Sequence, residues 1–317
     1  MKKLSLIVPM YNEEEMIPLF FEKINEVLDQ ITDYNKEIVC VNDGSKDRTL
    51  ELLKEYRKSN RNIHIVSFSR NFGHEAAVAA GFKCAEGDVM IVMDADLQDP
   101  PEVILDLLKE YKKGYKVVNA KRVDRKSDSF LKRKTAEAYY KVIAKMSGKI
   151  KVPENVGNFR LMDREVVDII NALPEKNRVF RVLVPFAGFK TGTVEFVRAK
   201  RPKGETHYNY KSMFTLAGDS IVSSSVSPLK WSLNLSLIIG FFSGAGLILD
   251  LILYLIHLCS SHGFMDGFGF STLTIVLCIF LSLAVILLSL GIIGEYIARI
   301  MIDSQNRPVY IIEEEIK

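Results

Sequence analysis

Residues 89–102 read Val-Met-Ile-Val-Met-Asp-Ala-Asp-Leu-Gln-Asp-Pro-Pro-Glu. The short apolar run rich in valine and isoleucine predicts a buried β-strand over Val89–Asp94. If the strand continues through Asp96, the side chains of Asp94 and Asp96 point to the same side, because strand side chains alternate with period two. Two such carboxylates suit a hard divalent cation such as Mg²⁺. Proteins usually hold Mg²⁺ through one or two carboxylates together with the phosphates of a substrate.

Outward from this stretch, strand-like and helix-like runs alternate through the first 120 residues. This alternation predicts βαβ units, an α/β fold and a mostly parallel sheet. The predicted strands are Leu4–Pro9, Glu37–Asn42, Ile63–Ser67, Val89–Asp94 and Lys116–Ala120. The predicted helices are Glu14–Gln30, Asp47–Lys58, Glu75–Cys84 and Pro101–Lys112.

Polar motifs follow three of these strands, where ligands of parallel sheets bind. The first strand runs into Tyr11-Asn12-Glu13-Glu14, and the second into Asn42-Asp43-Gly44-Ser45. Asp43 is placed to accept hydrogen bonds from a base or a ribose. Neither Gly-x-Gly-x-x-Gly after the first strand nor Gly-x-x-x-x-Gly-Lys-Ser/Thr occurs, which argues against a dinucleotide dehydrogenase and a P-loop NTPase.

The composition excludes several other classes of protein. The 317 residues carry a net charge of +3 and are 48% hydrophobic, so the chain is neither a disordered polyelectrolyte nor equipped with a basic nucleic-acid-binding arm. The four cysteines show no close pairing, which indicates neither a disulfide framework nor a zinc site. We also identify no secretory signal.

Two long apolar runs, about Leu233–Leu258 and about Leu273–Ile293, predict two transmembrane helices. The connector between them, residues 260–271, lacks Lys and Arg, whereas the outer flanks carry several. By the positive-inside rule, both termini and the large N-terminal part are therefore cytoplasmic. Tyr208–Pro228 predicts interfacial helices before the membrane. Asp250, inside the first run, is a candidate functional carboxylate because intramembrane charge is costly.

The sequence resembles the GT-A-fold, family-2 glycosyltransferases, in the branch of dolichol-phosphate mannose synthases and bacterial undecaprenyl-phosphate (bactoprenol) glycosyltransferases. The resemblance covers nearly the whole chain. It is carried by Val8–Glu14, Val41–Ser45, Ser69–Gly73, Asp94–Glu102, Asn158–Arg164 and Gly291–Tyr296.

The resemblance implies a cytoplasmic catalytic domain over residues 1–207, juxtamembrane helices over 208–230, a two-helix anchor over 231–302 and a cytoplasmic tail over 303–317. It also implies a multi-pass protein of the bacterial inner membrane that forms a homo-oligomer. The expected reaction is the inverting transfer of a sugar from a nucleotide-sugar, with UDP preferred, to undecaprenyl phosphate, and the expected metal is Mg²⁺ or Mn²⁺. Glucose, N-acetylglucosamine, galactose and mannose all remain open as the sugar.

The resemblance also implies roles for individual residues. Asp94, Asp96 and Gln98 face the metal and the diphosphate, and Arg122 and Arg160 meet the acceptor phosphate. Asp96 and Asn158 occupy catalytic positions. The residues that bind the nucleotide-sugar are Pro9, Tyr11, Asn12, Glu13, Asp43, Asp94 and Arg201.

Two positions depart from the family pattern. The family motif Gly-Asp-Phe-Arg reads Gly157-Asn158-Phe159-Arg160 here, and His207 stands where a lysine is usual. The aspartate is the usual candidate for the catalytic base, and asparagine cannot take up a proton. A phosphate monoester has a second pKa of about 6, however, so the acceptor is largely a dianion near neutral pH and can attack without a base.

The alternatives are a catalytically silent binding or assembly subunit, favoured by Asn158 and His207, and a processive polysaccharide synthase. The Gln-x-x-Arg-Trp motif of such synthases is absent around Trp231, the only tryptophan.

Overall fold

The computed structural model describes residues 1–123, 153, 155–176, 178–199 and 268–317, with single residues and short pieces between 234 and 252. The strands are β1 (Lys2–Met10), β2 (Tyr34–Asn42), β3 (Ile63–Phe68), β4 (Val89–Val92), β5 (Val117–Arg122), β6 (Val156–Asp163), β7 (Thr191–Phe196) and β8 (Ile312–Ile316). The helices are α1 (Ile17–Leu28), α2 (Thr49–Ser59), α3 (His74–Cys84), α4 (Val103–Lys112), α6 (Arg164–Ala172), α7 (Phe180–Phe186) and α10 (Phe268–Ser304).

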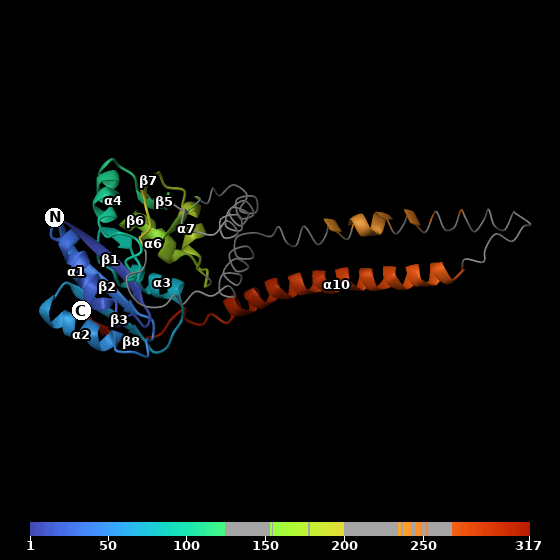
Figure 1. Cartoon of the computed structure of the whole chain (residues 1–317), viewed down its shortest axis with the longest axis horizontal. Helices are drawn as coiled ribbons and strands as arrows, with labels where there is room; N and C mark the ends of the chain where they lie inside the picture. Colours follow the sequence, from blue (N-terminus) through green and yellow to red (C-terminus); the bar gives the residue numbers. More distant parts are fainter. Residues whose placement is uncertain are drawn as a thin grey trace, which may run out of the picture. The chain divides into compact units, whose positions relative to one another are not determined.

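The chain forms two compact units (Figure 1). The first, the sheet unit below, consists of Met1–Ser224 and Asn306–Lys317, and the second consists of Ser225–Gln305. The sheet unit holds one eight-stranded sheet in the order β7-β5-β6-β4-β1-β2-β3-β8. Strand pairs β1–β2, β1–β4, β2–β3 and β5–β7 are parallel, and the pairs made by β6 and β8 are antiparallel. The predicted α/β fold with a mostly parallel sheet is confirmed.

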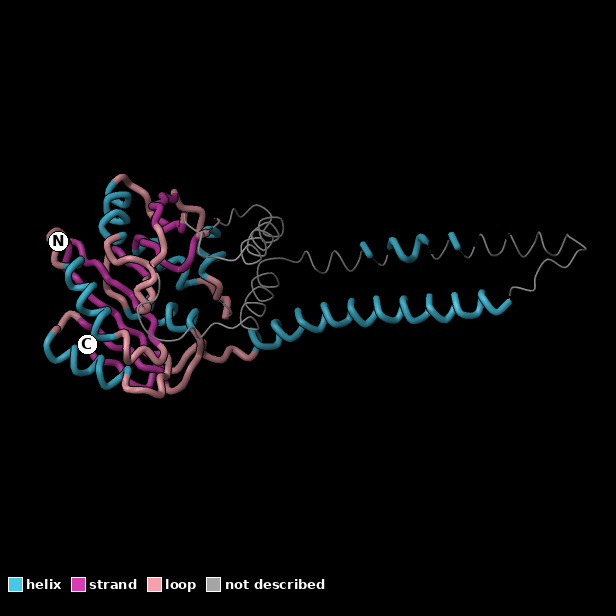
Figure 2. The backbone as a smooth tube through the Cα atoms, in the orientation of Figure 1, coloured by secondary structure: helices cyan, strands magenta, loops and turns pink. Residues whose placement is uncertain are grey.

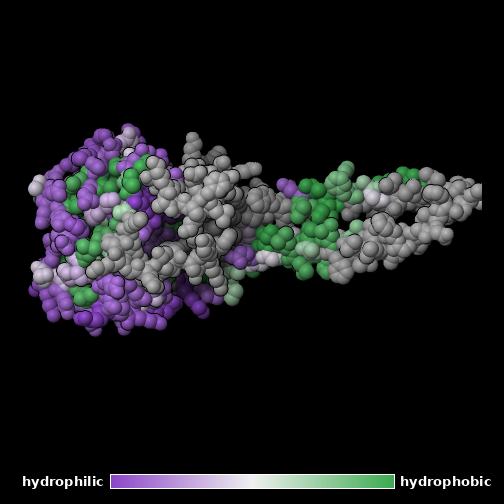
Figure 3. All heavy atoms as spheres, in the orientation of Figure 1, coloured by the Kyte–Doolittle hydropathy of each residue, from purple (hydrophilic) through white to green (hydrophobic). Residues whose placement is uncertain are grey.

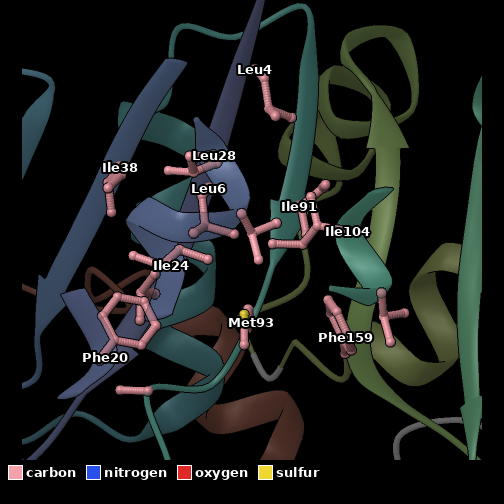
Figure 4. Close-up of a cluster of buried hydrophobic side chains, with 14 of the residues drawn as sticks. Leu4, Leu6, Phe20, Ile24, Leu28, Ile38, Ile91, Met93, Ile104 and Phe159 are labelled. Carbon is pink, nitrogen blue, oxygen red and sulfur yellow. The ribbon is translucent and has the colours of Figure 1, made fainter. Parts of the chain in front are cut away.

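Successive side chains of β1 lie on opposite faces of the sheet. Both faces are apolar, and helices pack on both. Leu4, Leu6 and Val8 belong to one core cluster with apolar side chains of α1 and α4, among them Phe20, Ile24, Leu28 and Ile104 (Figure 4). Ile7 lies in the second cluster, with α3, α6 and α7. Both faces of the central strands are therefore buried, as their nearly continuous apolar sequence requires.

The chain end supplies a strand that we did not predict. Strand β8 pairs antiparallel with the edge strand β3. Two further contacts hold this end of the chain against the unit: Glu314 bonds Lys54 of α2 at 2.5 Å, and Tyr310, just before β8, stacks on Phe68 at 5.0 Å between ring centroids. The last residues of the chain thus complete the sheet of the sheet unit.

Strand β4 ends at Val92, two residues before Asp94, so the expectation that a continuing strand aligns Asp94 with Asp96 is wrong. The backbone turns at residues 95–97, where Leu97 has a φ of +52°. Burial still alternates through the turn: Asp94, Asp96 and Gln98 are half-buried, while Ala95, Leu97 and Asp99 are buried. The turn therefore keeps the three predicted metal-site side chains accessible without a strand.

One helix of the described residues is long and apolar enough to cross a membrane. The stretch is Leu281–Ser304 of α10, and no residue of its apolar 18-residue window is buried. Its described apolar residues are coloured green in Figure 3. Helix α10 begins at Phe268, inside the predicted connector, and ends beyond the predicted second span at Ser304. The first predicted span, Asp250 and the predicted interfacial helices lie wholly or largely outside the described residues, so the structure does not establish two membrane helices.

A buried carboxylate joins β1, β2 and the loop before β4. Glu37 accepts hydrogen bonds from the Ser5 hydroxyl at 2.5 Å and from the backbone N–H of Glu86 at 3.1 Å, and the ammonium of Lys3 lies 3.5 Å away. His64 Nδ1 is 3.6 Å from the carboxylate. Burial opposes ionisation of Glu37, but these neighbours outweigh it and lower the pKa to about 2.

This pKa predicts a pH dependence of stability. Because the folded-state pKa lies below the ordinary value of 4.5, the stabilisation is complete above pH 4.5 and is lost as the pH falls toward 2. Between pH 5 and pH 3 we expect the wild-type chain to lose about 2 kcal/mol more unfolding free energy than Glu37→Gln. Urea unfolding of the full chain in detergent, followed by circular dichroism, measures this difference.

Glu86→Gln is the matched control, because its carboxylate is exposed and pairs with Lys3 at the surface. This variant should track the wild-type chain to within about 1 kcal/mol across the pH range. Parallel pH curves for the wild-type chain and Glu37→Gln would contradict the assignment.

Candidate active site

Three polar turns meet at one edge of the sheet. They follow β1, β2 and β4, which are neighbours in the order β4-β1-β2 and run parallel. The carboxyl ends of these strands therefore lie side by side. Figure 2 draws the strands of the sheet in magenta. The adjacency brings together most of the sequence-predicted site residues.

Direct hydrogen bonds join the first two turns. The Asn12 backbone, at a φ of +53°, donates its N–H to the Ser45 hydroxyl at 2.9 Å, and the Asn12 side-chain oxygen accepts from Lys46 N at 2.8 Å. The Glu13 N–H donates to the Thr49 hydroxyl at 2.9 Å. Asn12 thus fixes the path of the turn, while Pro9 is buried within β1 and Tyr11 and Glu13 are half-buried.

Asp43 holds the loop between β3 and α3 against the sheet. Its carboxylate accepts from the backbone N–H of Phe72 at 2.7 Å and of Gly73 at 3.0 Å, and from the Asn71 side chain at 3.0 Å. Burial raises the pKa of this carboxyl, and the backbone donors oppose the rise. We predicted that Asp43 accepts hydrogen bonds from a nucleoside; that role stays a prediction, and the structure adds a loop-anchoring one.

Gly44 lets this loop approach. It has a φ of +62°, and a Cβ built there would lie 2.2 Å from the backbone carbon of Arg70. No side chain fits between the turn after β2 and the loop at residues 69–73.

An ion pair links α3 to the turn after β4. His74, the first residue of α3, lies with Nε2 at 2.9 Å from Asp94 Oδ1. Burial opposes the charge of His74, but the Asp94 carboxylate outweighs it and raises the histidine pKa to about 9. Burial likewise opposes ionisation of Asp94, but the charges of His74, Arg122 and Arg198 lower its pKa. Each partner therefore favours the charged form of the other.

Asp96 and Gln98 share the turn with Asp94. The Gln98 N–H donates to Asp96 Oδ1 at 3.1 Å. No group of three or more His, Cys, Asp or Glu side chains gathers into a metal site within the part of the chain that the structure describes. Two accessible carboxylates nevertheless fit a divalent cation whose other ligands are phosphate oxygens and water.

Asn158 lies within this cluster, on β6. Its amide nitrogen is 3.2 Å from Glu75 Oε1 and 3.4 Å from His74 Nδ1. Its Oδ1 is buried and has no hydrogen-bond partner among the described residues. A chain of polar contacts therefore runs from Glu75 through Asn158 and His74 to Asp94.

Among the described residues, Arg160 is the largest fully buried side chain, and it is only 2% exposed. One guanidinium nitrogen donates to the Gly157 carbonyl at 2.6 Å. Burial and the charge of Arg181 lower its pKa to about 10, against the opposing effect of Glu75. The predicted contact between Arg160 and an acceptor phosphate stays a prediction, and this depth of burial counts against it.

Arg122 is the last residue of β5, two residues beyond the end of the predicted strand, and contacts the motif after β4. Its Nη2 lies 3.2 Å from Asp99 Oδ2. Arg198, which follows β7, lies 3.6 Å from the other oxygen of Asp99. Burial raises the pKa of Asp99, whereas the charge of Arg122 opposes the rise. Arg201 and His207 lie outside the described residues.

Our sequence analysis did not single out His74, Glu75, Asp99 and Arg198. His74 and Glu75 directly follow the Ser69–Gly73 motif, and Asp99 lies within the Asp94–Glu102 motif, so proximity to these motifs was the available signal. Arg198 carried no signal beyond its charge.

The family profile described as Glycosyl transferase family 2 matches residues 5–170. The chain belongs to this family. It is therefore a glycosyltransferase, and the matched segment contains all three polar turns together with Asn158 and Arg160.

Relatives match over nearly the full length. A bactoprenol glucosyl transferase of Shigella phage SfV is 42% identical over 316 residues, covering 99% of both chains. An uncharacterised glycosyltransferase of Bacillus subtilis (strain 168) is 42% identical over 310 residues, covering 98% of this chain and 93% of the relative.

The fold also matches a solved structure. A glucosyl-3-phosphoglycerate synthase from Mycobacterium tuberculosis, crystallised with Mn²⁺, uridine diphosphate and phosphoglyceric acid, superposes with a TM-score of 0.51. The match has 18% sequence identity and covers 70% of this chain and 76% of that one. It shows that the two proteins share a GT-A-like fold.

The close approach at Gly44 makes a prediction about stability. Gly44→Ala should destabilise the chain by about 2–4 kcal/mol, because it adds a steric clash with Arg70 to the cost of a left-handed backbone. Gly114→Ala is the matched control: its φ is +93°, but a Cβ there meets nothing within 4 Å. The control should cost only about 1–2 kcal/mol.

Urea unfolding measures both variants, and proteolysis within residues 69–73 reports on the loop. Faster cleavage in Gly44→Ala alone is the expected result. Equal destabilisation of the two variants, with unchanged cleavage, would contradict the packing of the loop on Gly44.

Proposed function

We propose that this chain transfers a sugar from a nucleotide-sugar to a polyprenyl phosphate. The observation that carries the proposal is the 42% identity, over 99% of both chains, to a bactoprenol glucosyl transferase. UDP is the preferred nucleotide and undecaprenyl phosphate the preferred acceptor. The donor sugar is a hexose or an N-acetylhexosamine, with glucose favoured by the name of that relative.

In this proposal the acceptor is a membrane lipid, and the chain is anchored in the same membrane. The apolar stretch Leu281–Ser304 and the apolar run at about Leu233–Leu258 anchor the chain with both termini in the cytoplasm. The protein is then a multi-pass, homo-oligomeric protein of the bacterial inner membrane. The acceptor is then a lipid whose tail remains in the bilayer and whose phosphate faces the cytoplasm.

Asp94, Asp96 and Gln98 would hold Mg²⁺ or Mn²⁺ together with the donor diphosphate. The fit rests on two half-buried acidic side chains that share one turn. When bound, the metal neutralises the negative charge that develops on the departing nucleoside diphosphate. The structure of the mycobacterial synthase, which contains Mn²⁺ and uridine diphosphate, is consistent with this assignment.

The proposed reaction is a single displacement. A phosphate oxygen of the acceptor attacks the anomeric carbon and forms the new C–O bond, while the bond to the nucleoside diphosphate breaks on the opposite face. The configuration at the anomeric carbon is therefore inverted. The dianionic acceptor has no proton to lose, so the reaction proceeds with an asparagine at position 158.

Asn158 orients groups in this scheme rather than taking up a proton. Its amide donates to Glu75, and its buried Oδ1 is left as a free acceptor within the described part of the site. The silent-subunit alternative rests on the same asparagine. Turnover by the wild-type chain separates the two.

The test uses the purified full chain with undecaprenyl phosphate, Mg²⁺ or Mn²⁺, and a panel of UDP- and GDP-sugars. Mass spectrometry of the lipid fraction should detect one glycolipid, formed in equal amount to the nucleoside diphosphate released. Asn158→Asp should turn over equally fast or faster, since the aspartate adds a base to a reaction that does not require one.

Asn60→Asp is the matched control. It makes the same chemical change at the end of α2, where the side-chain oxygen still accepts from Asn62 N. Its turnover should equal that of the wild-type chain. Glycolipid from the Asn158→Asp variant but not from the wild-type chain would establish that the wild-type chain is catalytically silent. No glycolipid from either protein would overturn the proposed function for the donors and acceptor tested.

A further inference from the structure

A buried carboxylate bridges two arginines from different strands. The side chain of Asp99 is 3% exposed, and its two oxygens lie 3.2 Å from Arg122 Nη2 and 3.6 Å from Arg198 Nε. The two arginine side chains are 28% and 37% exposed. The carboxylate therefore lies behind the two guanidinium groups, which retain accessible surface.

The backbone brings the three residues together. Strands β5 and β7 are parallel neighbours, so Arg122 at the end of β5 lies near Arg198, two residues past the end of β7. The N–H of Ala199 donates to the Gln98 carbonyl at 2.9 Å, which ties the segment after β7 to the residue before Asp99. The arrangement thus joins this pair of strand ends to the turn that carries Asp94 and Asp96.

Asp99 does not use all the hydrogen-bond donors of the two guanidinium groups. Their charges also act on Asp94, which balances part of the positive charge at this edge of the sheet. The Nε of Arg122 is buried and has no hydrogen-bond partner in the described residues. Gly157 leaves room for this guanidinium, since a Cβ there would lie 3.2 Å from Arg122 Nη2.

Two adjacent guanidinium groups with unused donors match the chemistry of a phosphate group, which accepts several charge-assisted hydrogen bonds. We propose that Asp99 is a positioning residue that holds Arg122 and Arg198 as a pair, and that this pair, the arginine clamp, binds a phosphate group of a substrate. The inference rests on the proposed function and adds Asp99 and Arg198 to it. The phosphate belongs either to the isoprenoid acceptor or to the nucleotide donor, and the test separates the two.

Binding measurements on the full chain in detergent test the arginine clamp. The probes are farnesyl phosphate for the acceptor, UDP with Mg²⁺ for the donor, and farnesol as the uncharged analogue, each titrated by calorimetry. Arg198→Gln should weaken one phosphate-bearing probe about tenfold, because a charge-assisted hydrogen bond is lost. It should leave the affinity for farnesol unchanged.

Asp99→Asn tests the positioning role. It should weaken the same probe about threefold to tenfold, because the amide holds the arginines less firmly. In the double variant Asp99→Asn/Arg198→Gln, the fold loss of affinity should be smaller than the product of the two single fold losses, since both changes act on the same arginine clamp. A merely structural role for Asp99 would weaken all ligands together and give multiplicative losses.

Lys121→Gln is the matched control, because it removes one positive charge from the residue next to Arg122, where Lys121 pairs with Glu195 at 3.0 Å. It should change each affinity less than twofold. Equal losses in Lys121→Gln and Arg198→Gln, or no loss in Arg198→Gln for either phosphate probe, would overturn the arginine clamp. If Asp99→Asn does not fold, the exposed Arg198 still provides this test.

Failure of the arginine clamp and failure of the proposed function give different results. Glycolipid synthesis is measured separately on the wild-type chain, whereas the clamp is tested by binding alone. A wild-type chain that binds farnesyl phosphate through Arg198 but makes no glycolipid would retain the clamp and reject the transfer reaction.

Discussion

Acidic side chains at the carboxyl end of the sheet lie partly or wholly out of water, and each must be compensated by a donor or a cation. Asp43 is compensated by backbone N–H groups of the loop before α3, Asp94 by His74 on α3, and Asp99 by two arginines. Each carboxylate therefore attaches another segment to the sheet. Folding and site assembly are consequently the same event in this region.

The same contacts explain how segments distant in sequence converge on one turn. The motif after β4 sits between α3 on one side and the ends of β5 and β7 on the other. Asn158 joins the group from β6 and contacts both His74 and Glu75. A substrate phosphate or a cation entering here meets charges that these contacts have already oriented, which lowers the cost of ordering them on binding.

The sequence predicted the first five strands and four helices to within a few residues. In this part of the chain, the spacing of the apolar residues and the polar residues between segments indicate the same elements. Strand β8 could not be found this way: Ile312-Glu-Glu-Glu-Ile316 has little apolar character, and its partners Lys54 and Phe68 are more than 240 positions away. The roles of Asp99 and Arg198 likewise depend on tertiary pairing. The burial of Arg160 could not be predicted for the same reason. The alternation of side chains along β6 assigns Arg160 to one face of the sheet, but it does not show whether that face meets a ligand or the protein interior.

We propose that the turn carrying Asp94 and Asp96 receives the metal and the donor diphosphate. Anomalous scattering at the manganese edge, from crystals of the full chain grown with UDP and Mn²⁺, locates the ion directly. We expect one peak within coordination distance of an oxygen of Asp94 or Asp96 and of a diphosphate oxygen. A nucleotide bound with its Mn²⁺ at any other place in the chain would contradict it.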